Sequence, residues 1–273
     1  MASFMKRPAT DTQVAHWQRL WLYVFVALVL VVLILPTLIV IPISFTASSF
    51  MEFPPRSYSL RWYRVYLQSS ELMDATWISL QVATLTTLVA TPCGVAAAYG
   101  VRCLRTGHAD LLAGIVVLPL IVPVILIAIG LFFVYIPLGF NNTILGLVVA
   151  HTGLSVPFVF VIVLTRLRQF DFRQEQAAQS LGANRGRAFL TVTLPQIKFS
   201  VIAGALLAFI TSFDEAVVAY FVGTGPMSTL TRRMFMSLEY GVEPTIAAIS
   251  TLLVALTVLI VVVTQILVVE RPK

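Results

Sequence analysis

From Trp21 to Phe45 the chain carries no charged side chain, and similar apolar runs recur along its length. In hydrocarbon only helices and closed barrels satisfy their own backbone polar groups, and a helix needs about 20 apolar residues to cross. The composition agrees with a lipid environment, because 59% of the residues are hydrophobic and 11% are charged, against roughly 25% charged in a soluble domain. Long uncharged runs favour helices, so the chain is predicted to be an all-α membrane protein.

Six segments are predicted to cross the membrane, each ending near charged residues, prolines or polar clusters. They are about Trp21–Phe45, Ala75–Val101, Leu111–Leu138, Thr143–Leu164, Phe199–Val222 and Pro244–Val269. The transmembrane domain is thus expected over 21–269, between an N-terminal segment 1–20 and a tail 270–273. The first segment is too long for a signal-peptide core and has no evident small-residue cleavage pattern, so we interpret it as a retained anchor.

Basic residues predict the orientation, because Lys and Arg in short loops are retained on the cytoplasmic side. With the N-terminus inside, the only basic residues left outside are Arg56, Arg61, Arg64, Arg232 and Arg233. Six spans return the C-terminus to the cytoplasm. The net charge of +6 is spread over loops beside the membrane, so topology and anionic lipid explain it better than nucleic-acid binding does.

A polar island lies in the predicted cytoplasmic loop 166–198, between the fourth and fifth spans. It consists of Gln176-Ala177-Ala178-Gln179-Ser180-Leu181-Gly182 and, after a basic spacer, Phe189 and Val192-Thr193-Leu194-Pro195. Small and apolar residues before Gly182 predict a short helix that ends there in a left-handed turn. Arg185 to Phe189 predict a second short helix that Pro195 helps limit. We expect this helix–turn–helix to be a docking surface for a partner protein.

The island resembles the cytoplasmic EAA loop of permease subunits of ABC importers. That pattern reads Glu-Ala-Ala, three residues, Gly, nine residues and Ile-x-Leu-Pro, and it is matched here by Gln176, Ala177, Ala178, Gly182, Val192, Leu194 and Pro195. Gln176 replaces the family's glutamate and Val192 its isoleucine. Glu175 is adjacent, but neighbours on a helix point about 100° apart, so Glu175 need not take the glutamate's place.

Other stretches are similar to the second permease of spermidine/putrescine importers and their relatives, which also handle opines and 2-aminoethylphosphonate. These stretches are Ser212-Phe213-Asp214-Glu215, Val217-Val218, Gly225-Pro226, Thr229-Leu230, Arg233-Met234-Phe235 and Pro244-Thr245-Ile246-Ala247-Ala248. The resemblance implies a type I ABC importer permease fold in the bacterial inner membrane that works by alternating access. It also implies three kinds of partner: a second permease forming a heterodimer, two copies of an ATP-binding subunit, and a periplasmic solute-binding protein.

The resemblance assigns coupling to the ATPase to the loop, because in that family the element fits a cleft on the ATP-binding subunit. The coupling residues it implies are Glu175, Gln176, Ala177, Ala178, Leu181, Gly182, Ala183, Phe189, Leu194 and Pro195. The chain itself has no phosphate-binding loop, since Lys6, Lys198 and Lys273 each follow a residue other than glycine. We therefore expect a non-catalytic subunit that binds no cofactor or metal, with ATP and Mg used by the partner.

Asp214 and Glu215 are the residues most informative about the translocated solute, because they lie inside or at the outer end of the fifth predicted span. A carboxylate at a helix centre costs on the order of 2.5–3.5 kcal/mol to insert, so such groups face a cavity or a partner. One hypothesis is that they attract a cationic ammonium group. The alternative is that they cap the helix end or pair with Arg232, Arg233 or the sister subunit.

Hydroxyl groups in the second and fifth predicted spans complete the predicted pathway: Thr87, Thr91, Thr211 and Ser212. Close helix packing is the favoured alternative explanation for them. Two functions are thus weighed. The first is a permease subunit of an ATP-driven importer, for which a polyamine is favoured over an opine, 2-aminoethylphosphonate or another small solute. The second is a self-sufficient secondary transporter, although no internal repeat of the kind common in that class is evident.

Overall fold

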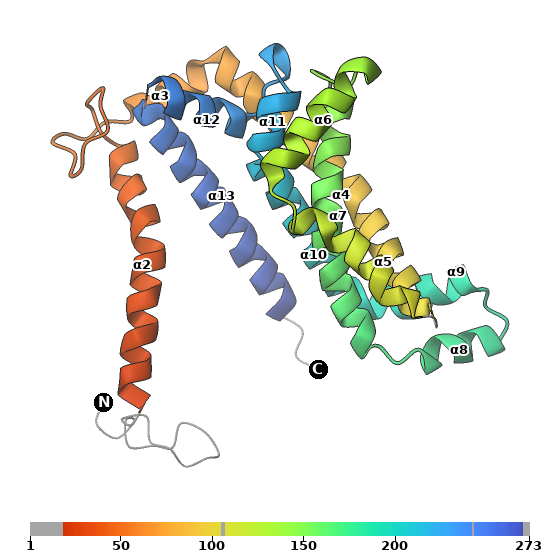
Figure 1. Cartoon of the computed structure of the whole chain (residues 1–273). Helices are drawn as coiled ribbons and strands as arrows, with labels where there is room; N and C mark the ends of the chain where they lie inside the picture. The colour runs from red at the N-terminus through yellow and green to blue at the C-terminus, as the bar shows by residue number, and fades with distance from the viewer. Residues whose placement is uncertain (1–18, 105–106, 242, 270–273) are drawn as a thin grey trace. The chain divides into compact units, whose positions relative to one another are not determined.

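The computed structural model describes residues 19–104, 107–241 and 243–269 (Figure 1). Within these ranges the chain is helical apart from turns and one isolated antiparallel bridge between Thr46 and Tyr58. The predicted all-α class is confirmed. Most of the predicted N-terminal segment 1–20 and the whole tail 270–273 lie outside the described residues, as do both termini. The chain divides into two compact units, residues 69–239 and the remainder.

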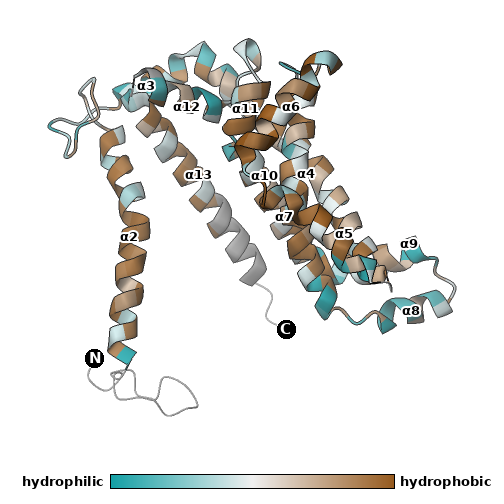
Figure 2. Cartoon of the chain, in the orientation of Figure 1, coloured by the Kyte–Doolittle hydropathy of each residue, from teal (hydrophilic) through white to brown (hydrophobic). Residues whose placement is uncertain are grey.

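The smaller unit contains α2 (Leu20–Ser44), α3 (Arg61–Gln68) and α13 (Pro244–Val269), and α13 packs on both other helices. Figure 2 shows hydrophobic residues along almost all of α2, whose side chains are exposed within this chain. A helix that is apolar all round is stable only in lipid or against other protein. α3 is tied to the end of α2, because Tyr63 Oη and Ser44 Oγ are 2.6 Å apart and hydrogen-bonded.

The larger unit is built on α4 (Ser70–Cys103), α7 (Ile144–Gln169) and α10 (Leu194–Asp214), each of which packs against the other two. Around them lie shorter helices: α5 (His108–Val117), η2 (Leu118–Leu120), α6 (Val124–Leu138), α8 (Arg173–Ser180), α9 (Arg185–Ala188), η3 (Phe189–Thr193), α11 (Val217–Val222), η4 (Gly225–Met227) and α12 (Leu230–Tyr240). Val159 and Phe160 of α7 lie at the centre of one buried cluster, with small residues of α4 and α10 packed on them. This three-helix core supports the predicted coupling loop and the carboxylates Asp214 and Glu215.

Four of the described helices are long and apolar enough to cross a membrane, and a fifth span results if the bent pair α5–α6 is counted as one. The four are α2, α4, α7 and the continuous segment Arg185–Asp214. The pair α5–α6 bends by 89° at η2 and Pro123, since a proline removes a backbone donor and permits a break. The sixth predicted segment forms α13 with the predicted bounds.

The fifth predicted span, about Phe199–Val222, is not one continuous helix. α10 already begins at Leu194, and it ends at Asp214, after which Glu215 is extended with ψ 110° and α11 follows as a separate helix. The Glu215 carboxylate explains the break. Its Oε1 accepts hydrogen bonds from the backbone N–H groups of Val217 and Val218 at 2.7 and 2.9 Å, which satisfies donors at the start of α11.

Candidate functional site

The predicted helix–turn–helix is present as α8 and α9, at one end of the larger unit (Figure 1). Asp171 Oδ1 accepts from Arg173 N at 3.0 Å at the start of α8, and Asn184 Oδ1 accepts from Arg187 N at 2.8 Å in α9. Between them Gly182 adopts φ +95°, the region that favours glycine. Ala183 N donates to Ala178 O at 3.1 Å, so the turn is closed by backbone hydrogen bonds typical of helix C-termini.

The outer surface of this element is exposed and includes one fully presented apolar side chain. Leu181 is 90% exposed, beside the exposed Gln176, Ala177 and Gly182. Of the other coupling residues implied by the loop pattern, Pro195 is exposed and four are partly buried: Ala178, Ala183, Phe189 and Leu194. We call Gln176, Ala177, Leu181 and Gly182 the docking surface. A single exposed leucine is ordinary on a protein surface, so the docking role of these residues stays a prediction from the loop pattern.

Pro195 does not limit the second short helix, contrary to the prediction. α9 passes through the π-helical turn η3 into α10, and Pro195 lies in the first turn of α10. The π turn has a local cause. Pro195 has no N–H for the carbonyl of Thr191 and its ring crowds that carbonyl, so the helix widens and Leu194 N donates five residues back, to Phe189 O.

Glu175 differs from the other predicted coupling residues because it faces the inside of this chain. It is 3% exposed, and its carboxylate accepts hydrogen bonds from Tyr99 Oη, from Thr193 Oγ1 at 2.6 Å and from Gln179 Nε2 at 3.4 Å. The prediction included Glu175 because it adjoins Gln176, the position that matches the family's glutamate. The inward direction of Glu175 depends on Tyr99, which lies 76 positions away in the sequence. The residues around Glu175 therefore do not predict this direction.

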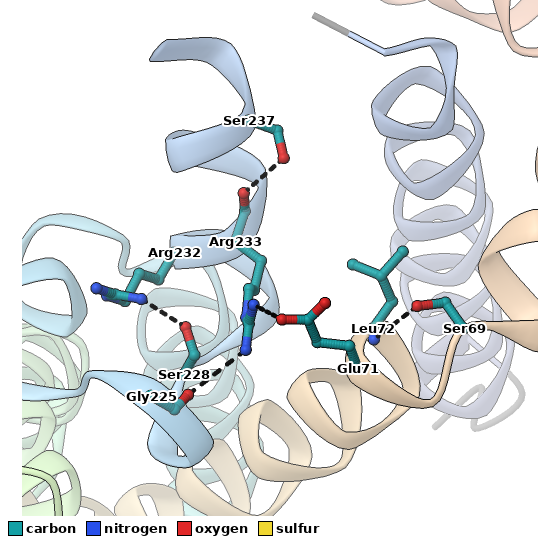
Figure 3. A network of polar contacts seen from close by, with 8 residues as sticks. All are labelled: Ser69, Glu71, Leu72, Gly225, Ser228, Arg232, Arg233 and Ser237. Atoms are coloured by element: carbon teal, nitrogen blue, oxygen red, sulfur yellow. Dashed lines mark hydrogen bonds and ion pairs between the residues drawn. The ribbon is translucent and has the colours of Figure 1, made fainter. Parts of the chain in front are cut away.

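The second candidate site is the end of α10, where the structure distinguishes the two carboxylates. Glu215 caps the start of α11, whereas the predicted alternative was a cap at the end of the fifth span. Asp214 is exposed, and within the described part of the chain it makes no hydrogen bond or ion pair. Neither residue pairs with the arginines of α12. Figure 3 shows Arg233 between Glu71 and the Gly225 carbonyl, while Arg232 Nη1 donates to Ser228 Oγ at 2.8 Å.

Two of the predicted pathway hydroxyls form hydrogen bonds with other groups of the larger unit. Thr87 Oγ1 donates to Ala83 O at 2.7 Å within its own helix, and Ser212 Oγ is hydrogen-bonded to His151 Nδ1 at 2.9 Å, which links α10 to α7. The bond between Ser212 and His151 is of the interhelical kind that accompanies close packing. Thr91 is half-buried on α4, and Thr211 lies beside Ser212 on α10. Asp214 therefore remains the predicted pathway residue with a free charged group.

Residues 90–269 match the family of binding-protein-dependent transport system inner membrane components. The chain belongs to this family. The match includes α8, α9 and all of α10, so both candidate sites lie inside it. A member of this family is a membrane component of a transport system rather than a catalytic subunit, and the predicted family is confirmed.

Two curated relatives from Escherichia coli strain K12 are similar to this inner membrane component over most of its length. The putrescine transport system permease protein PotI is 31% identical over 240 residues, which cover 85% of each chain. The spermidine/putrescine transport system permease protein PotC is 29% identical over 250 residues, which cover 91% of this chain and 94% of the relative.

A solved structure supports the fold of the transport component. One chain of a bacterial ABC transporter involved in import of the acidic polysaccharide alginate has a TM-score of 0.69, with 95% of this chain and 99% of that chain covered. At 12% identity the likeness concerns the fold alone. It agrees with the predicted permease fold.

Proposed function

We propose that this chain is one of two permease subunits of an ATP-driven importer that moves a polyamine, putrescine or spermidine, across the bacterial inner membrane. The observation that carries the proposal is the similarity to two polyamine permeases over at least 85% of the chain, including both candidate sites. No feature of the described structure favours the secondary-transporter alternative. An opine or an aminophosphonate importer would differ in solute only.

The proposed assembly places six spans in the membrane with both termini in the cytoplasm. A related permease completes the pathway, two ATP-binding subunits lie beneath, and a periplasmic binding protein delivers the solute. The docking surface would enter a cleft on an ATP-binding subunit, where ATP and Mg are used. Because α4, α7 and α10 pack on one another, a displacement at α8 would move packed helices together instead of deforming them one by one.

The Asp214 carboxylate would attract the protonated amine of the solute. The carboxylate lies at the end of α10 and is exposed, so it is available to a cation, whereas the Glu215 carboxylate is occupied by the start of α11. Two unit charges about 4 Å apart in water attract by roughly 1 kcal/mol. A protonated amine would therefore be drawn to this point without being held tightly, as passage requires.

The proposal is tested by uptake into liposomes that contain the full complex. We expect labelled putrescine to accumulate only with ATP, the ATP-binding subunits and the binding protein, and unlabelled spermidine to compete. If an opine or 2-aminoethylphosphonate competed and spermidine did not, the proposed solute would have to be changed from a polyamine to a compound of that class. Uptake by the chain without any ATPase would establish the secondary transporter.

Replacing Asp214 with Asn should raise the KM for putrescine about fivefold, the equivalent of the roughly 1 kcal/mol attraction in water, and leave ATP hydrolysis unchanged. The measurement is initial uptake against solute concentration. Asp74→Asn is the matched control, because Asp74 is an exposed carboxylate near the start of α4 and its loss changes the net charge equally. An unchanged KM in the Asp214 variant would count against a role in the pathway.

A further inference from the structure

Glu175 is a buried carboxylate held by neutral donors from three elements. Tyr99 belongs to α4, Thr193 to η3 immediately before α10, and Gln179 to α8 itself. An ionised carboxylate only accepts hydrogen bonds, and each of these partners donates one. Glu175 makes no ion pair within the described residues. The position of the Glu175 carboxylate therefore depends on where these three donors lie.

The surroundings hold two of the donors in place. The Tyr99 ring lies edge-on to Phe189, with centroids 4.7 Å apart, and its centroid is 6.3 Å from that of Phe172, so it packs against residues that precede and follow α8 in the chain. Thr193 is fully buried and occupies the last position of the π turn. A π turn changes the direction of the side chains that follow it, and such turns occur frequently at functional sites.

The neighbours of Glu175 do not share this role. Gln174 and Gln176 are exposed, as expected for positions turned by about 100° on a helix. Gln174 Oε1 accepts from Gln196 Nε2 at 2.6 Å, which also links α8 to α10, but that bond is exposed to water. An exposed hydrogen bond adds little net stability because water competes for both groups, whereas an unpaired buried group is costly.

We infer that Glu175 is the positioning residue that fixes α8 to α4 and α10, so that displacement of the docking surface reaches both helices. This inference rests on the proposed function. Glu175 therefore contacts the membrane helices and not the ATP-binding subunit. The exposed residues of α8 and of the turn would contact that subunit. Without the carboxylate, α8 would still form but could move without carrying α4 and η3 with it.

The first test is Glu175→Ala in the reconstituted full complex. We expect solute transported per ATP hydrolysed, and stimulation of ATP hydrolysis by the loaded binding protein, each to fall about tenfold, within the usual range of coupling between two sites. Unstimulated hydrolysis by the assembled complex should continue. Gln174→Ala is the matched control, because it removes the exposed link between α8 and α10, and should stay within about twofold of the unaltered complex.

If the complex with Glu175→Ala does not assemble, milder variants test the positioning role of Glu175. Tyr99→Phe and Thr193→Val each delete one donor with little change of shape. Each should lower both ratios, and each should add little to Glu175→Gln, since residues in one hydrogen-bond network are non-additive. Unchanged ratios in assembled complexes, or full additivity, would overturn the inference.

The stimulation ratio also separates this inference from the polyamine proposal. If the complex takes up another solute, the polyamine proposal fails, and stimulation by the correctly loaded binding protein still decides the role of Glu175. If the chain transports without an ATPase, both fail together.

Discussion

Replacing Gly182 with Val is expected to abolish ATP-driven uptake while the complex still assembles. Gly182 has φ +95°, and a residue with a Cβ in a left-handed conformation is disfavoured by roughly 1–2 kcal/mol, most strongly if it is β-branched. A Cβ at this position would meet nothing within 4 Å. The effect therefore comes from the backbone alone, which must leave its conformation and redirect Leu181 and Gln176 on the docking surface.

The measurement is uptake of labelled solute together with the yield of intact complex on size-exclusion chromatography. Gly182→Asn should retain more activity than the valine variant, because Asn tolerates positive φ better than other residues with a side chain. Gly186→Ala in α9 is a second control, since its Cβ would lie in ordinary contact, 3.7 Å from Asn184 Oδ1. Wild-type uptake by Gly182→Val would show that the turn geometry does not matter for coupling.

The turn at Gly182 was predictable because its signals are local. A glycine after a short run of helix formers predicts a helix end in the left-handed region, and the structure has that geometry. The loop spacing did not predict the π turn or the direction of Glu175. The π turn has a local cause, the crowding of the Thr191 carbonyl by Pro195 four residues on, which the loop pattern does not represent. The direction of Glu175 depends on a distant contact, the approach of Tyr99 from α4.

Hydropathy located the helices that are long and apolar enough to cross a membrane, but not the break after Asp214. The segment from Ala216 to Val222 continues the apolar pattern of α10, so a helix through Phe199–Val222 was the natural expectation. The break arises because a side-chain carboxylate competes for backbone donors, and Glu215 takes the two N–H groups that begin α11. Side-chain capping of this kind is recognised from sequence only when the residue stands at an expected helix start.

Gly94 governs the closest approach in the three-helix core. A Cβ added there would lie 2.6 Å from Val159 Cβ and 3.1 Å from the backbone nitrogen of Phe160, and one added at Gly204 of α10 would lie 3.3 Å from Val159 Cα. Both glycines thus let their helices approach the same point on α7. These contacts involve backbone and Cβ atoms, which cannot rotate away, so a larger residue must push whole helices apart.

Gly94→Val is therefore expected to destabilise the larger unit by about 1–3 kcal/mol, the usual cost of overpacking a close-packed core, and to lower the midpoint of thermal unfolding in detergent. Gly100→Ala is the matched control on the same helix, because its added Cβ meets nothing within 4 Å and alanine favours helix. Because α4 and α10 would be displaced from α7, transport should fall with stability in Gly94→Val, unlike Gly182→Val, where uptake is lost from a stable complex. Equal midpoints for Gly94→Val and Gly100→Ala would mean that α4 and α7 do not pack at this distance.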